Sequence, residues 1–347
     1  MKRAKLAHIC AVSALALALG SCSQHPATTG GSPSSQTGTQ PSVIRIDGSS
    51  TVYPITEAVA EEFQKSTGAR ITISISGTGG GFKRLCAGEV AIIGASRPIK
   101  HIEEQACAAN KLAFVELPIA YDGLAVVVNP QNYWVQSMSL RELRRIWEPA
   151  AQKKVLSWNH IRPEWPELPL HLFGAGVDSG TYDYFTKAVI GQEHQSRGDF
   201  TSSEDDNVLV QGVSRDVSAL GFFSLAYYEE NRDKLKLVAV DDGEPQNGDG
   251  PIAPSRKTVS NGTYQPLSRP IFVYVSKAAL AQPEVVALLE FYLDNAPALV
   301  KEARYVPLPE RAYALVHKRL KAGKVGSVFA GRGSEIGVTV EELLAHE

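Results

Sequence analysis

Four absences limit what the 347-residue sequence can encode. Its 35 Lys and Arg residues are matched by 37 Asp and Glu residues, so the chain lacks the basic excess that a nucleic-acid partner requires. The eight histidines show no H-E-x-x-H or other metal-ligand spacing. No G-x-S-x-G segment marks a nucleophile, and beyond residue 22 no run is long and apolar enough to span a membrane. These absences argue against a nucleic-acid-binding protein, a metalloenzyme and a serine hydrolase.

The first 22 residues predict an export signal. Lys2, Arg3 and Lys5 give a basic start, and the apolar run that follows over residues 6–19 is too short to cross a bilayer as a stable helix. The run ends in Leu-Gly-Ser-Cys, which resembles the lipobox of bacterial lipoproteins. That resemblance implies lipidation of Cys22 and a protein anchored to a membrane, in the periplasm or at the cell surface.

The next segment, residues 23–42, contains almost no apolar side chains and predicts a flexible tether. The folded part then begins near Val43 and spans roughly 300 residues, which favours two lobes over one. Cysteine is scarce there, since only Cys86 and Cys107 remain. In an exported protein, two remaining cysteines favour a disulfide, and a zinc site is the alternative.

Residues 77–81, Gly-Thr-Gly-Gly-Gly, place four glycines between a strand-like segment and a helix-like one. Their spacing fits neither a P-loop nor a dinucleotide fingerprint, because Phe82 falls where both motifs need a glycine when counted from Gly77. Glycines let backbone N–H groups approach a ligand, and a helix N-terminus adds partial positive charge, so the segment can bind an anion. A tight turn that needs positive φ is the alternative.

Strand-like and helix-like segments alternate along the folded part. This alternation predicts an α/β fold with mostly parallel strand pairing. The predicted strands are 43–47, 71–75, 91–95, 114–117, 124–128, 170–173 and 271–275, and the predicted helices are 53–66, 82–87, 103–110, 140–147, 181–190, 283–296 and 310–322, with a further helix beginning near Val208.

Ser, Thr and Gly gather at three of the predicted strand-to-helix junctions, residues 48–52, 77–81 and 178–181. Each cluster alone is consistent with an ordinary helix N-cap. In a parallel sheet, however, such junctions lie at the carboxyl ends of the strands, where ligands bind, so the three can converge. Their N–H and O–H donors suit a small oxyanion with several acceptor oxygens.

Six segments together resemble the periplasmic phosphate-binding proteins that feed an ABC importer, in the lipoprotein branch that carries Ala-Ser-Arg-Pro-Ile. The resemblance covers most of the chain after the tether, and the set is specific although no single segment is. The segments are GSSTVYPI (48–55), SGTGGGFKRLCAGEV (76–90), GASRPI (94–99), AYDGLAVVVN (120–129), DSGTYDYF (178–185) and SEDDNVLVQGV (203–213).

The resemblance implies a type II periplasmic binding fold, in which two α/β lobes are joined by a hinge that the chain crosses twice. With crossings near 120–123 and 266–270, residues 43–121 and 268–347 would form one lobe and residues 122–267 the other. Inorganic phosphate would bind with high affinity in the cleft between the lobes, without a metal or cofactor. A monomeric receptor would then deliver it to the permease and ATPase subunits of the importer.

The phosphate-binding residues that the resemblance implies lie mainly at the three junctions. Val52 would act only through its backbone N–H, and Ser50 is a neighbouring hydroxyl of Thr51. The implied set is Ser50, Thr51, Val52, Thr78, Gly79, Arg97, Ser179, Gly180, Thr181 and Asp206.

Two positions depart from the better-known members of that family. Four residues before Ser-Gly-Thr they have an Arg, where this sequence has Ala175, and after one strand end they have an Asp, where it has Arg97. We therefore expect Arg97 to give the planar, two-pronged contact that oxyanions favour, with a surface ion pair as the alternative.

The missing Asp matters because a carboxylate can accept a proton from phosphate, and sulfate has no proton to offer. Asp206 is the first candidate to replace it, since its acidic run precedes a predicted helix of the second lobe. A capping and solvated turn is the alternative for that run. Further candidates are Asp47, Asp122, Asp178, Glu204 and Asp205.

Three alternatives to a phosphate receptor follow from these residues. The changed Arg and Asp positions leave sulfate or molybdate as a possible cargo. A phosphatase would also cradle phosphate, with Ser50 or Ser179 as nucleophile, although neither has a His or Lys beside it in sequence. A surface adhesin or signalling protein could be built on the same fold.

Overall fold

A mixed β-sheet organises the fold in the computed structural model, which describes residues 43–335 and 340–345. The predicted export signal, the tether and Cys22 lie outside the described residues. The strands are β1 (Val43–Gly48), β2 (Arg70–Ile73), β3 (Ile92–Ala95), β4 (Phe114–Val128), β5 (Ser137–Ser139), β6 (His171–Ala175), β7 (Thr201–Ser203), β8 (Ala219–Ser224), β9 (Lys236–Leu237), β10 (Ala239–Asp241), β11 (Ser268–Ser276) and β12 (Val306–Pro307).

The main sheet has the order β2-β1-β3-β11-β4-β8-β6-β7, with β9 and β12 also paired to β4, while β5 and β10 form a separate pair. Pairing is parallel between β1 and its neighbours β2 and β3, and between β6 and its neighbours β7 and β8. It is antiparallel around β4 and β11. The α/β prediction is confirmed, and the mostly parallel pairing holds on the two sides of the sheet but not at its centre.

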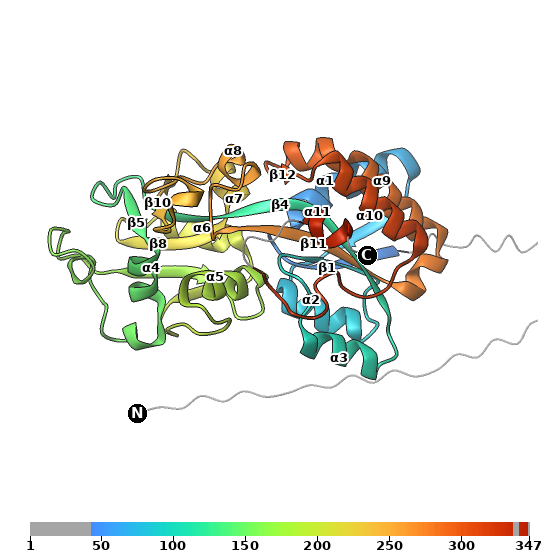
Figure 1. Cartoon of the computed structure of the whole chain (residues 1–347), viewed down its shortest axis with the longest axis horizontal. Coiled ribbons are helices and arrows are strands. Elements are labelled where there is room, and N and C mark those ends of the chain that lie inside the picture. Colours follow the sequence, from blue (N-terminus) through green and yellow to red (C-terminus); the bar gives the residue numbers. More distant parts are fainter. Residues whose placement is uncertain (1–42, 336–339, 346–347) are drawn as a thin grey trace, which may run out of the picture. The chain divides into compact units, whose positions relative to one another are not determined.

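Three clusters of buried apolar side chains lie on the two sides of the middle of β4 and β11. On one side, two clusters comprise residues before 121 and after 270, together with Ala226. On the other side, one cluster comprises residues 124–267, together with Val306. We call the parts of the chain on these two sides the first lobe and the second lobe. Figure 1 shows β4 and β11 running from one lobe into the other, so the chain crosses between the lobes in these two strands.

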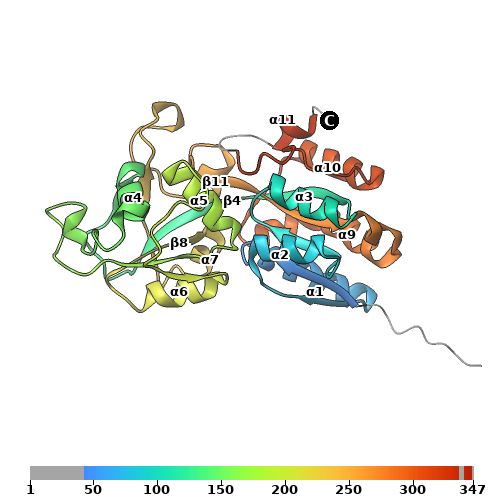
Figure 2. The same ribbon diagram turned by 90° about the horizontal axis from the view of Figure 1, so that it is seen from below.

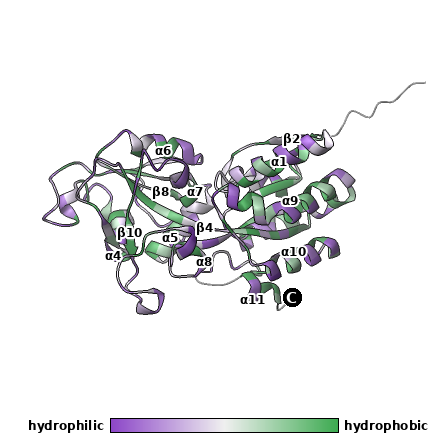
Figure 3. Cartoon of the chain, turned by 90° about the horizontal axis from the view of Figure 1, so that it is seen from above, coloured by the Kyte–Doolittle hydropathy of each residue, from purple (hydrophilic) through white to green (hydrophobic). Residues whose placement is uncertain are grey.

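Helices cover the sheet in both lobes, and Figure 3 shows hydrophobic residues along the strands that they enclose. None of the helices in the described residues has the length and apolar character to cross a membrane. The first lobe contains α1 (Tyr53–Thr67), α2 (Gly77–Cys86), α3 (His101–Ala109), η4 (Lys277–Ala281), α9 (Pro283–Glu302), α10 (Glu310–Ala322) and α11 (Val340–Ala345), and the second contains α4 (Leu140–Trp147), η1 (Pro149–Ala151), η2 (Trp158–His160), α5 (Gly180–Ile190), α6 (Asp206–Ser214), α7 (Leu225–Glu230), η3 (Pro245–Asn247) and α8 (Arg256–Ser260).

Helix α1 illustrates how the sequence pattern becomes packing. Ile55, Val59 and Phe63 recur every four residues and are buried, because that spacing places them on one helical face. Gly68 follows in the left-handed conformation, with φ 73°, which ends the helix without the strain that a side chain would add. The buried face packs against α9.

Two segments differ from the sequence prediction. Helix α2 begins at Gly77 and not at Phe82, so the glycines form its first turn. Strand β4 is continuous through Tyr121 to Gly123, where the sequence predicted a break between two strands, because β11 pairs with it across that whole stretch. Cys86 and Cys107 form a disulfide between α2 and α3, as the cysteine count favoured.

Candidate functional site

Three strand-to-helix junctions and the end of β3 meet where the lobes touch, and they bring hydroxyl groups together. Ser49 Oγ donates to Ser96 Oγ at 3.0 Å, and Thr78 Oγ1 lies 3.2 Å from the same Ser96 oxygen. Across the boundary, Thr51 Oγ1 lies 3.1 Å from Thr181 Oγ1 of the second lobe. We call these five buried residues the hydroxyl cluster. The predicted convergence of the junctions therefore occurs.

Helix α5 approaches this cluster through its first residue, Gly180. A Cβ at Gly180 would lie 2.7 Å from both Ser96 Oγ and Thr78 Oγ1, so only glycine permits the approach. Ser179 caps the helix, since its Oγ accepts a hydrogen bond from the N–H of Thr181 at 3.1 Å. Figure 2 shows α5 and α2 lying next to each other at the lobe boundary.

The guanidinium group that reaches the hydroxyl cluster belongs to Arg269 on β11. It donates to Thr181 Oγ1 at 2.8 Å and to the carbonyl oxygen of Gly180 at 3.1 Å, and it pairs with Asp122 at 2.9 Å. Arg269 and Asp122 are directly opposite each other on the antiparallel strands β11 and β4. Both side chains are about 1% exposed.

Sequence reasoning missed Arg269. A usable signal was present, because a lone arginine adjoins the apolar run 271–275 and a lone aspartate adjoins the apolar run 124–128. Buried charges are stable only when they are paired or bind a ligand. Opposite charges at the edges of two apolar strands are therefore candidates for one buried pair.

Arg97 does not take the predicted position. Its guanidinium pairs with both carboxylate oxygens of Glu103, at 2.7 and 2.8 Å, and its Nε donates to Asp183 at 2.5 Å. Although burial opposes the charged form, these two acids raise the pKa of Arg97 above its usual range. The guanidinium of Arg97 is thus held by carboxylates away from the hydroxyl cluster, and the guanidinium that reaches the cluster is that of Arg269.

Two predicted backbone donors also have partners within the chain. The N–H of Val52 donates to the carbonyl oxygen of Ser49 at 3.1 Å, because the segment forms the turn that opens α1. The N–H of Gly79 donates at 2.7 Å to the carbonyl oxygen of Asp178 in the second lobe. The glycines of α2 therefore serve contact between the lobes, and neither N–H is presented to a ligand as the sequence suggested.

Gly77 supports the same conclusion. Its φ is +76°, and a Cβ there would lie 2.5 Å from the carbonyl oxygen of Asp178 and 2.6 Å from Glu204 Oε2. A side chain at this position would hold the first turn of α2 away from the second lobe. The glycine-rich segment is therefore a surface of close approach between the lobes.

Asp206, the first candidate for the proton acceptor, lies in the first turn of α6 and meets the first lobe directly. Its Oδ1 accepts a hydrogen bond from Ser50 Oγ at 3.0 Å, and its Oδ2 accepts one from the N–H of Ser224 at 3.4 Å. Burial raises the pKa of Asp206 to about 7, against the effect of these two hydrogen bonds. A buried carboxyl with this pKa can hold or accept a proton near neutral pH.

The other candidate carboxylates have different surroundings. Asp47 accepts hydrogen bonds from Ser76 and Arg84, Asp178 pairs with the exposed Lys83, and Asp205 caps α6. Glu204 faces Gly77, and burial raises its pKa to about 7. Asp122 is paired with Arg269. Of these residues, Asp206 combines contact with a predicted site hydroxyl and a pKa near neutrality.

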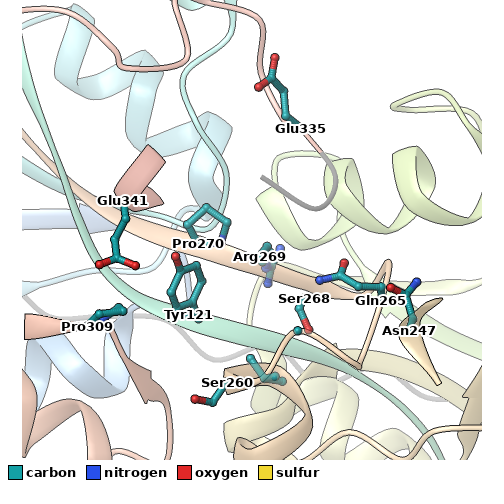
Figure 4. Close-up of a pocket in the computed structure, with 12 residues that line it drawn as sticks. Tyr121, Asn247, Ser260, Gln265, Ser268, Arg269, Pro270, Pro309, Glu335 and Glu341 are labelled. Carbon is teal, nitrogen blue, oxygen red and sulfur yellow. The ribbon is translucent and has the colours of Figure 1, made fainter. Parts of the chain in front are cut away.

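A cavity of about 320 Å³ lies beside β4 and β11, the two strands that run between the lobes, and Arg269 forms part of its wall (Figure 4). Tyr121, Gln265 and Ser268 line it together with the carboxylates Glu335 and Glu341. None of the hydroxyl cluster residues lines it. Two carboxylates in its wall disfavour an anion in this cavity.

The arrangement combines hydroxyl donors, one guanidinium and one protonatable carboxyl at a boundary that both lobes build. Such a set of groups can surround a small oxyanion with donors and accept a proton from it. In residues 43–335 and 340–345, no group of three or more His, Cys, Asp or Glu side chains is placed to hold a metal ion.

A family model, two curated proteins and a crystal structure are similar to this chain over most of its length. A family model described as the PBP superfamily domain matches residues 32–296. The protein SphX of Synechocystis sp. is 49% identical over 87% of this chain and 88% of its own length. The phosphate-binding protein PstS of Staphylococcus haemolyticus is 34% identical over 79% of this chain and 84% of its own. The crystal structure of a possible phosphate-binding protein from Planctomyces limnophilus is 42% identical, with a TM-score of 0.59, and the match covers 82% of this chain and 99% of that one.

Proposed function

This chain belongs to the PBP superfamily and, within it, to the PstS-like phosphate-binding proteins, and we propose that it binds inorganic phosphate with high affinity between its lobes and delivers it to an ABC importer. The PstS relative is named a phosphate-binding protein, so this chain is a solute-binding protein and not an enzyme. The type II periplasmic binding fold predicted from the sequence is confirmed by the same membership.

The observation that carries the proposal is the meeting of donors from both lobes. Thr51 of the first lobe and Thr181 of the second are 3.1 Å apart, and Arg269 donates to Thr181 beside them. A phosphate ion held among these donors would gain contacts from both lobes only when they are closed. We therefore assign phosphate binding to the hydroxyl cluster with Arg269, Ser50, Ser179 and Gly180.

Asp206 is the proposed acceptor of the phosphate proton. Phosphate near neutral pH carries at least one proton, and a carboxylate that receives it makes a favourable hydrogen bond. Sulfate would place an unprotonated oxygen against the same carboxylate, and the repulsion would exclude it. The raised pKa of Asp206, about 7, suits a group that shares a proton with its ligand.

The lobe boundaries, the membrane anchor and the monomeric state are parts of the same proposal. We place residues 43–121 and 268–347 in the first lobe and residues 122–267 in the second, in keeping with the separate apolar cores. Lipidation of Cys22 would hold the receptor near the permease, with residues 23–42 as the tether.

Calorimetric titration tests the proposal directly. The chain, stripped of bound phosphate, is titrated with phosphate, sulfate and molybdate at pH 5 and pH 8. At pH 8, where Asp206 is ionised, we expect tight phosphate binding with little sulfate binding. At pH 5 its carboxyl is protonated and no longer repels sulfate, so the preference for phosphate over sulfate should narrow. Equal affinity for sulfate or molybdate would mean that the cargo is a different oxyanion.

Substitutions at two neighbouring positions test whether Asp206 accepts the proton of phosphate. Loss of a hydrogen bond to a charged group costs roughly 1.5–3 kcal/mol, so Asp206→Asn should weaken phosphate binding about 10- to 150-fold and narrow the preference over sulfate. Asp205→Asn is the matched control, because asparagine also caps helices and Asp205 makes only a local capping bond. Unchanged phosphate and sulfate affinities in Asp206→Asn would exclude this acceptor.

A further inference from the structure

A second group of charged side chains joins the lobes beside the hydroxyl cluster. It contains two cations and one carboxylate from the first lobe, and two carboxylates and one histidine from the second. We call it the ionic latch; its residues are Arg97, Lys100 and Glu103 of the first lobe and Asp183, Glu193 and His194 of the second.

Asp183 is the centre of the ionic latch. Its Oδ2 lies 2.5 Å from Arg97 Nε and 2.9 Å from Lys100 Nζ, both of which come from the other lobe. Lys100 Nζ also lies 3.0 Å from Glu193 Oε2, which adds a third contact across the boundary. His194 Nε2 lies 2.8 Å from Asp183 Oδ1 within the second lobe. Two carboxylates of the second lobe are thus paired with cations of the first.

Burial makes the central pair more than a surface contact. The side chains of Arg97 and Asp183 are each 2% exposed. Burial by itself would raise the pKa of Asp183, but His194, Arg97 and Lys100 hold it well below its usual range. The aspartate is therefore charged in the closed form, and its charge is compensated by His194 of its own lobe and by Arg97 and Lys100 of the other lobe.

The ionic latch is connected to the hydroxyl cluster through the chain itself. Arg97 directly follows Ser96, whose hydroxyl bonds Ser49 and faces Thr78. Asp183 lies two residues after Thr181, in the first turn of α5. Pairing of Arg97 with Asp183 therefore fixes the end of β3, where Ser96 lies, against the start of α5, where Gly180 and Thr181 lie.

We propose that Arg97 and Asp183 are positioning residues that latch the lobes shut and thereby set how long phosphate stays bound. This inference rests on the proposed function of phosphate binding. The pair touches no phosphate donor through its charged groups, and it acts by stabilising the closed form, in which Thr51 and Thr181 meet. The latch slows release and contributes little to the first encounter with phosphate.

The decisive variant is Asp183→Asn, which keeps the size of the side chain and removes its charge. Removal of one partner of a buried charge pair acts mainly on dissociation, and a cost of 2 kcal/mol or more corresponds to an increase of about 30-fold or more in the dissociation rate. We expect that increase in stopped-flow release of inorganic phosphate, with an association rate within about threefold of the original protein. An unchanged dissociation rate would overturn the latch.

Lys83→Met is the matched control, because Lys83 also pairs across the lobes, with Asp178, but both side chains are exposed. It should leave the dissociation rate nearly unchanged. Lys100 is the more exposed of the two cations of the ionic latch. Lys100→Met should therefore raise the phosphate dissociation rate by a smaller factor than Asp183→Asn. Arg97→Lys keeps a charge next to Asp183 and should restore part of the residence time that Arg97→Met loses.

A purely structural role for the pair predicts a different pattern. It would lower the thermal unfolding midpoint of the phosphate-free chain and would alter association and dissociation together. The latch predicts a change concentrated in dissociation. Equal changes in the two rates of Asp183→Asn, accompanied by a lowered midpoint, would overturn it.

Small-angle scattering of the phosphate-free protein separates this inference from the proposed function. Asp183→Asn should have a larger radius of gyration than the original chain, because its lobes are less often closed. If the original chain binds no phosphate, the proposed function fails, and the scattering comparison still decides whether the pair closes the lobes. Identical scattering curves would overturn the latch.

Discussion

Two buried arginine–aspartate pairs lie within the same region of this protein, and they differ in what they join. Arg269 and Asp122 are opposite each other on neighbouring strands, β11 and β4, which both run through the hinge. Arg97 and Asp183 belong to different lobes. The first pair is set by strand pairing, so we expect it to persist when the lobes separate, whereas the second depends on contact between the lobes.

This difference separates two tasks of a two-lobed binding protein. Arg269 is held by Asp122 on the neighbouring strand, so we infer that its guanidinium is in place for an oxyanion before the lobes close. Arg97 is satisfied by Glu103 on its own lobe and gains Asp183 when the lobes meet. We infer that the Arg269–Asp122 pair, which we call the hinge pair, sets the affinity for the anion. The Arg97–Asp183 pair sets the dissociation rate of the anion.

Arg269→Met should have the largest effect on affinity. It removes the cation from the hydroxyl cluster and also leaves Asp122 buried without its partner. Loss of one partner of such a pair costs about 2–5 kcal/mol, so phosphate affinity should fall about 30- to 5,000-fold. Isothermal titration calorimetry at constant ionic strength measures the change.

Arg197→Met is the matched control for this variant. Arg197 is also a buried arginine paired with an aspartate, Asp199, at 2.6 Å, but it contacts carbonyl oxygens of Ile146 and Val155 within the second lobe. It should lower the free energy of unfolding and leave phosphate affinity nearly unchanged. A comparable loss of affinity in both variants would mean that Arg269 acts through stability and not through contact with phosphate.

The contrast between the two arginines also marks the limit of sequence-based prediction here. Alternating segments predicted the α/β fold, and the Ser/Thr/Gly junctions predicted which hydroxyls gather, because both depend on local patterns. Arg97 was placed at the site since it follows a strand that ends there. The direction of its side chain depends on Glu103 and Asp183, and Asp183 is 86 residues away in the chain.

Arg269 was missed for the complementary reason. Its position opposite Asp122 depends on the register of β11 against β4, which joins residues 147 positions apart. The same applies to the glycines of α2, whose role depends on the approach of Asp178 from the other lobe. Local patterns located the candidate site, whereas long-range strand register and lobe contact decided which charged groups face it.

The pKa of Asp206, whose carboxylate accepts a hydrogen bond from Ser50 across the lobe boundary, predicts how the free energy of unfolding depends on pH. Its pKa is about 7 in the folded protein against 3.8 for an ordinary aspartate, so the folded state binds its proton more tightly. Stability from this group is therefore present at low pH and is lost as pH rises through about 7. Asp206→Asn should become more stable than the original chain by an amount that grows from about pH 4 to pH 7, up to about 4 kcal/mol.

Urea unfolding of both phosphate-free proteins across this pH range measures the difference. Glu204 also has a pKa raised to about 7, but it titrates in both proteins, so the difference isolates Asp206. A difference that does not change with pH would mean that Asp206 is not protonated in this range. Arg269 and Asp122 would then be the charged pair that dominates the electrostatics of the site.

Gly180→Ala tests the cluster from the side of the second lobe. The added methyl group would lie 2.7 Å from Ser96 Oγ and Thr78 Oγ1, so the lobes could not close to their present separation. Overpacking costs about 1–3 kcal/mol, which corresponds to a loss of about 5- to 150-fold in phosphate affinity. Gly198→Ala is the control, since a Cβ there meets only Gln152 at 3.7 Å. Equal affinities in the two variants would argue against closure around the cluster.

The smallest effect is expected where a charge pair between the lobes is exposed to solvent. Lys83 Nζ lies 2.8 Å from Asp178 Oδ1, a distance as short as those in the ionic latch, but the two side chains are 71% and 41% exposed. Water and salt screen such a pair, which contributes about 0–1 kcal/mol. Lys83→Met should therefore change the phosphate dissociation rate by less than about fivefold at low salt, and the difference should vanish near 0.5 M salt.

Because burial protects Asp183 from screening, the effect of Asp183→Asn should persist under the same conditions. If both variants lost their effects equally with added salt, burial would not distinguish the two contacts, and the latch would be an ordinary surface attraction.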